Sequence, residues 1–179
     1  MTWTSFHRRG DVLRDVIAAA DQRRDGVLPR DVDGVSATFA DDLDLLAALQ
    51  LKWHTRLAGR IEREQMTQPM DLRASVVHAW HQTADELPGV RAVLDEQRLR
   101  PADAATAEVM RKSGDKEHVL LAVTAGAAGT DDALAGAVGA RIEAEAKATS
   151  PSHDVLDELA IDHSERPTLL GRLKAALAA

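Results

Sequence analysis

Apolar residues recur at steps of three and four along most of this chain, which is the spacing of amphipathic α-helices. The first such stretch runs from about Ser5 to Arg24, and its apolar face consists of Phe6, Leu13, Val16, Ile17 and Ala20. Asp25-Gly26 then ends the pattern, and the Pro-containing stretch 27–34 has the residue types of a turn. The pattern predicts a first helix over 5–24, followed by a loop.

The longest predicted helix covers about 36–66. Its apolar stripe consists of Leu46, Leu49, Trp53, Leu57 and Ile61. The opposite face carries Lys52, Arg56, Arg60 and Arg63. Acidic side chains gather near the start of this helix, where they stabilise its dipole, so we interpret them as part of helix initiation: Asp41, Asp42 and Asp44.

Three more helices follow in the pattern. A third begins at Pro69, and Pro88-Gly89 is expected to kink or interrupt it before it continues to Leu94. A fourth begins at Pro101, with a break predicted at 113–115 because Ser-Gly-Asp is a turn signal. A fifth is expected from Thr130, a good capping residue, to about 150. Its many Ala and Gly residues suggest close contact with another helix.

The pattern of residues 150–179 indicates a C-terminal extension. A short turn of helix is expected over 155–161 and a final amphipathic helix over 168–178. One face of the latter carries Leu169, Leu170, Leu173 and Leu177. The sequence therefore predicts an all-α fold: an antiparallel helical bundle of about five main helices plus one or two short C-terminal helices. We expect one domain over 1–179, with residues 150–179 as its C-terminal extension.

Composition and charge narrow the classes of function. The chain has no Cys, which excludes disulfides, thiolate metal sites and a cysteine nucleophile. A net charge of −7 opposes nucleic-acid binding, which normally uses a basic face. No window has the length and apolarity of a membrane span or of a signal peptide. We therefore expect a cytoplasmic protein with neither a membrane nor a nucleic-acid partner.

Histidines supply the candidate ligands. His54, His81 and His118 lie on or beside the apolar stripes of different predicted helices, and Asp85 follows His81 by one helical turn. Facing helices can bring such groups together around a divalent metal ion or iron, as in ferritin-like or hemerythrin-like bundles. However, the sequence contains no Glu-x-x-His pair, of which a ferritin-like di-iron site needs two. The favoured alternative is that these histidines lie between helices and donate to a backbone carbonyl or a carboxylate.

The segment Thr168-Leu169-Leu170-Gly171-Arg172-Leu173-Lys174 resembles the short tail by which cargo proteins dock inside bacterial encapsulin shells. That resemblance implies an encapsulated helical-bundle cargo. The simpler interpretation is an ordinary amphipathic helix, whose leucines close the core or bind a partner.

No motif for covalent catalysis is present: the sequence lacks Gly-x-Ser-x-Gly, a phosphate-binding Gly-rich loop and a dinucleotide fingerprint. We therefore expect a non-catalytic protein of binding or assembly that has a protein partner or self-associates. A metal-binding bundle, possibly encapsulated, is the alternative. Under the first hypothesis, charge reversal on the basic face at 52–63 is expected to leave the fold intact and to alter association.

Overall fold

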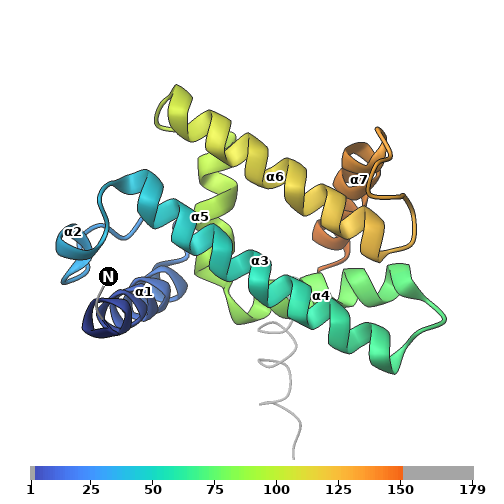
Figure 1. Cartoon of the computed structure of the whole chain (residues 1–179), viewed down its shortest axis with the longest axis horizontal. Helices are drawn as coiled ribbons and strands as arrows, with labels where there is room; N and C mark the ends of the chain where they lie inside the picture. The colour runs from blue at the N-terminus through green and yellow to red at the C-terminus, as the bar shows by residue number, and fades with distance from the viewer. Residues whose placement is uncertain (1–2, 151–179) are drawn as a thin grey trace, which may run out of the picture. The chain divides into compact units, whose positions relative to one another are not determined.

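The computed structural model describes residues 3–150, with side chains from Arg8 onward. This part of the chain is entirely helical, which confirms the predicted all-α class (Figure 1). The helices are α1 (Trp3–Arg23), α2 (Val35–Thr38), α3 (Asp42–Thr67), α4 (Leu72–Glu86), α5 (Pro88–Leu99), α6 (Ala104–Thr124) and α7 (Ala135–Thr149). None of them combines the length and the apolarity needed to cross a membrane.

The chain divides into two compact units, Met1–Ala148 and Thr149–Ala179. All contacts described below lie within the first unit. The leucines of the predicted C-terminal helix lie outside the described residues: Leu169, Leu170, Leu173 and Leu177.

The predicted long helix is in fact divided into α2 and α3, so its expected start at residue 36 was wrong. Phe39 is extended, at φ −109° and ψ 133°, and its side chain is buried beneath the Arg9 guanidinium, 4.3 Å from the ring centre. Asp41 then caps α3 by accepting from the backbone N–H of Asp44 at 2.8 Å. The burial of Phe39 and this cap together end one helix and begin the next.

Helices α3 and α4 form an antiparallel pair, and α5 crosses α3 steeply (Figure 1). Pro88 occupies the first turn of α5, so the predicted interruption at Pro88-Gly89 is a complete helix boundary. This boundary lets α5 turn away from α4 and contact α1, α3 and α6 as well. α5 therefore contacts the N-terminal helix α1 as well as α3, α4 and α6.

Two boundaries differ from the sequence pattern farther along the chain. Helix α6 runs without a break through Gly114, which is buried, so the polar Ser-Gly-Asp signal did not end the helix. Helix α7 begins at Ala135, five residues after the expected cap at Thr130. There the Asp132 side chain accepts from the N–H of Leu134 at 2.8 Å. Tertiary packing outweighs the local turn signal at Gly114, whereas a local hydrogen bond of Asp132 accompanies the later start of α7.

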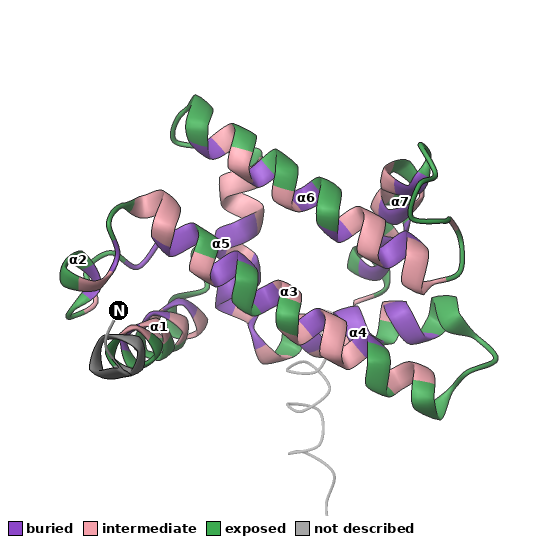
Figure 2. Cartoon of the chain, viewed as in Figure 1, coloured by how far each residue is buried: buried purple, intermediate pink, exposed green. Residues whose placement is uncertain are grey.

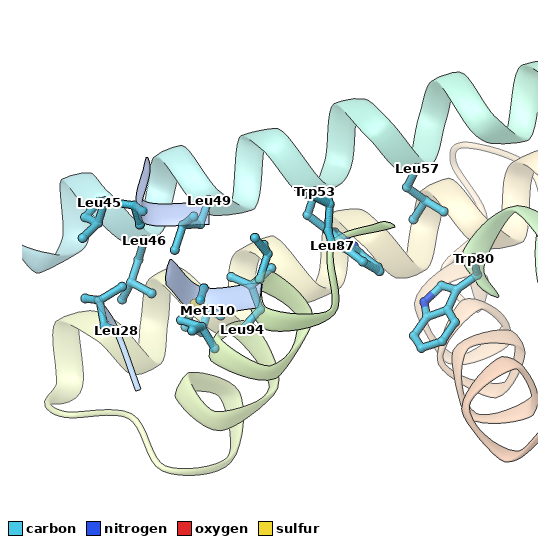
Figure 3. Packing of buried hydrophobic residues seen from close by; sticks show 14 of the residues in the cluster. Leu28, Leu45, Leu46, Leu49, Trp53, Leu57, Trp80, Leu87, Leu94 and Met110 are labelled. Carbon is cyan, nitrogen blue, oxygen red and sulfur yellow. The ribbon is translucent and has the colours of Figure 1, made fainter. Parts of the chain in front are cut away.

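The hydrophobic core runs along one face of α3 (Figures 2 and 3). The predicted stripe of that helix is confirmed, because all five of its residues are at most 2% exposed: Leu46, Leu49, Trp53, Leu57 and Ile61. In Figure 3 Leu46 and Leu49 point toward Leu94 and Met110, and Trp53 lies beside Leu87. Burial of this apolar area is the main favourable term in folding.

A glycine lets α7 pack against α6 at very short range. A Cβ built on Gly139 would lie 1.8 Å from the backbone oxygen of His118, whereas one on Gly136 of the same helix would meet nothing within 4 Å. The expected close helix contact of the Ala/Gly-rich helix is thus confirmed, and it lies within the chain.

We predict that Gly139→Ala lowers the free energy of unfolding by at least about 2 kcal/mol, because α6 and α7 must separate to admit the methyl group. Gly136→Ala is the matched control and is expected to be neutral or to stabilise by up to about 1 kcal/mol. Urea denaturation followed by circular dichroism measures both. Equal stability of the two variants would contradict the close packing of these helices.

Candidate functional site

The most prominent polar feature of the interior is the carboxylate of Glu117, whose side chain is 0% exposed. It accepts hydrogen bonds from Trp53 Nε1 at 3.0 Å, from Arg91 Nη1 at 3.2 Å and from Arg98 Nη2 at 2.5 Å. Arg91 and Arg98 are two turns apart on α5, so both point from the same face. A buried carboxylate persists only with such partners, since desolvation of an unpaired charge is very costly.

A second carboxylate, that of Glu143 on α7, extends the cluster. His118 Nε2 lies 2.7 Å from one oxygen and donates to it, because an ionised carboxylate can only accept. Arg98 Nη1 and Lys147 Nζ approach the other oxygen to 3.1 and 3.2 Å. Burial acts to raise the pKa of Glu143, but the His118 hydrogen bond and the charges of Arg91, Lys147 and Arg98 outweigh it and hold that pKa well below its ordinary value.

Arg91 links the carboxylates to the aromatic core. Its guanidinium binds Asp95 through two hydrogen bonds, at 2.5 and 3.0 Å, and lies 4.8 Å above the ring of Trp53. Within this group, which we call the ion network, three cations face three carboxylates: Arg91, Arg98, Lys147, Asp95, Glu117 and Glu143. The ion network is therefore balanced in charge when His118 is neutral.

The structure does not gather the four candidate metal ligands. His118 binds Glu143, and His81 Nε2 donates to the carbonyl oxygen of Ala146 at 2.7 Å. His54 is half-buried on α3, and Asp85 is exposed on α4. Within residues 3–150, no three His, Asp or Glu side chains are placed to hold a metal ion. The contacts of His81 and His118 are those of interhelical histidines, and a metal site stays a prediction.

Sequence reasoning missed the ion network. None of its six residues was named among the candidates, which included only His118, a partner of Glu143. One signal existed: Glu117 precedes the buried Leu121 by one turn and therefore occupies an apolar-stripe position. A charged residue at such a position requires a buried partner, but the sequence does not say which one.

The basic face of the long helix also differs from the expectation of a free charged surface. Arg56 and Arg60 both pair with Glu86 of α4, and Arg60 also donates to Gln82 at 2.9 Å. These contacts connect α3 to α4. Charge reversal at Arg56 or Arg60 would therefore disturb helix packing, so it cannot serve as a clean test of association.

One surface hollow lies beside the ion network, and another lies between α1 and α3. A cavity of about 630 Å³ lies between α5, α6 and α7, with Arg98, His118, Glu143 and Lys147 among its lining residues. A groove of about 460 Å³, which we call the α1–α3 groove, is lined mainly by small and apolar residues: Gly10, Leu13, Ala47, Ala48 and Leu51. The first hollow has the size of a small-molecule site, and the second suits an apolar side chain or a helix.

The charged side chains that line the cavity are engaged in ion pairs, and its described lining includes no Ser, Thr or Cys. The His118–Glu143 pair could orient an imidazole, but no hydroxyl or thiol of the lining is there for it to activate. No protein-family model matches this sequence, and no curated protein or solved structure matches the chain. The function is therefore inferred from the geometry of the described residues.

We predict that Glu117→Gln lowers the free energy of unfolding by about 3–5 kcal/mol, because it leaves the buried Arg91 and the partly buried Arg98 without their shared negative charge. Glu108→Gln is the control, since Glu108 forms only exposed ion pairs with Arg111 and Lys112, and it should leave the urea midpoint unchanged. A wild-type midpoint for Glu117→Gln would show that the ion network does not hold the helices together.

The lowered pKa of Glu143 predicts a specific acid sensitivity. A carboxyl group whose pKa is lower in the folded state stabilises the fold above its ordinary value of 4.5, and this contribution is lost as the pH falls toward the folded-state pKa. Glu143→Gln should therefore be less stable than the wild type at neutral pH and lose less further stability below about pH 4.5. Urea denaturation at a series of pH values tests this, and parallel curves for the two proteins would refute it.

Proposed function

We propose that this protein is a non-catalytic protein of binding or assembly, and that it self-associates through the α1–α3 groove. The observation that carries the proposal is Leu51, a large apolar side chain that is 66% exposed at the edge of this groove. Exposed apolar groups next to an apolar hollow are typical of protein–protein contacts.

The shape of this face favours a second copy of the chain as the partner. Gly10, Ala47 and Ala48 leave a shallow floor, while Leu51 projects beside it. In a two-fold symmetric contact the same patch meets itself, so Leu51 of each copy can enter the hollow of the other. Arg9 is held by Asp44 through two hydrogen bonds, which keeps its long side chain in a fixed position at the edge of the groove.

The remaining features agree with a binding role. The buried charges of Arg91 and Glu117 are paired within the chain, and the Gly139 face of α7 is already packed against α6. Neither is therefore available for a macromolecular contact. The α1–α3 groove, by contrast, is an open apolar surface of the described residues.

We predict that the wild type has the mass of two chains in light scattering at high micromolar concentration, and that Leu51→Glu reduces it to the mass of one chain. The introduced carboxylate would have to be buried without a partner in the contact. Leu134→Glu is the matched control, because Leu134 is also 66% exposed but lies outside the groove. A one-chain mass for the wild type, or an equal effect of both substitutions, would contradict the proposed contact.

A further inference from the structure

We propose that the cavity between α5, α6 and α7 is a binding site for a small carboxylate that carries an apolar body. This site is independent of the proposed self-association, because none of the residues that line the cavity belongs to the α1–α3 groove. The proposal depends on the unused hydrogen-bonding capacity of the cavity wall and on its apolar lining residues.

Two cationic side chains of the cavity wall, Arg98 and Lys147, have N–H groups that donate no hydrogen bond within the described residues. Arg98 has five N–H groups, and within the described residues it donates one hydrogen bond to Glu117 and one to Glu143. Lys147 donates to Asp95 and lies 3.2 Å from Glu143, which uses at most two of its three N–H groups. A ligand with acceptor oxygens can therefore bind here without breaking the ion network.

Two of the three carboxylates that line the cavity, those of Glu143 and Asp95, have partners on both oxygens, while the exposed Asp115 pairs with Arg111 through one oxygen. One Glu143 oxygen receives His118, and the other lies near both Arg98 and Lys147. Both oxygens of Asp95 accept from Arg91, and one of them also accepts from Lys147. A cationic ligand would have to compete for these oxygens, whereas a carboxylate meets free N–H groups. Charge-assisted hydrogen bonds of this type are the strong ones.

The cavity also has apolar lining residues. Leu99, Pro101, Ala107 and Met110 line it together with the ion pair of Arg111 and Asp115, so that an apolar group attached to the carboxylate would be partly removed from water. A mid-helix glycine, Gly114, adds space beside the Arg98 guanidinium.

Gly114 is more open than helix packing requires. A Cβ at this position would meet Arg98 only at 3.9 Å, an ordinary contact, so that Ala would fit and would favour the helix. This differs from Gly139, where backbone forbids any side chain. The space at Gly114 thus contributes to the cavity rather than to a helix contact.

The test uses hexanoate as the probe, titrated into the full chain and followed by ¹H–¹⁵N NMR. Hexylammonium and 1-hexanol have the same apolar body with a cationic or a neutral head. We expect saturable shifts of the Gly114 amide and its neighbours with hexanoate, with a dissociation constant on the order of 1 mM or below, and about tenfold weaker binding of the other two. Absence of saturation with hexanoate, or equal or tighter binding of either of the others, would overturn the proposal.

Variants locate the site. Lys147→Met removes an ammonium group from a side chain that is 42% exposed, and it should weaken hexanoate binding about tenfold. Lys112→Met is the matched control, since Lys112 is also an ion-paired lysine but lies outside the cavity, and it should bind hexanoate as the wild type does. Gly114→Leu should abolish binding by filling the space. If Gly114→Leu does not fold, Lys147→Met decides, and unchanged binding by a folded Lys147→Met would overturn the assignment.

Discussion

The carboxylate of Glu117 is the group on which the arrangement of the helices depends. It lies on α6 without exposure to solvent, and its three partners come from α3 and α5. Any packing that separates Glu117 from Arg91 and Arg98 would leave charges buried and unpaired, which costs several kcal/mol. Apolar side chains could fill the same space in several arrangements of the helices, but only a few of these arrangements satisfy the directional contacts of Glu117. The steep crossing of α5 over α3 is the arrangement that satisfies them (Figure 1).

From this centre the polar contacts continue to α7. Arg98 binds both Glu117 and Glu143, so one guanidinium connects α5 to two other helices. His118 follows Glu117 directly on α6 and donates to Glu143, while Gly139 brings the backbones of α6 and α7 together. The cations and carboxylates of the ion network balance one another. The buried charged groups Arg91, Glu117 and Glu143 are thereby committed to contacts within the chain. The binding roles that we propose use the α1–α3 groove and the cavity beside the network.

The two hollows suit different partners because their walls differ in chemistry. The α1–α3 groove is lined by small and apolar residues, with Leu51 projecting from its edge, so that it favours a shape-matched apolar contact. The cavity between α5, α6 and α7 combines apolar lining residues with unused N–H groups of Arg98 and Lys147, so that it favours a small anion with an apolar body.

The sequence by itself determined the helical class, the buried stripe of α3 and the interruption at Pro88-Gly89, because these follow from local periodicity and from the missing N–H of proline. It did not determine that α6 continues through Gly114 or that Phe39 divides the long helix, since packing outweighs local propensity at both points.

Tertiary structure alone decided the partners of the charged residues. Arg91, Glu117 and Glu143 are far apart along the chain, and nothing in their spacing shows that they meet. His118 was recognised as an interhelical residue, but its carboxylate partner lies 25 positions away on a helix whose register is set by Gly139. Ion pairing between distant segments depends on how helices pack, and the hydrophobic pattern constrains which faces are buried, not which charges face one another.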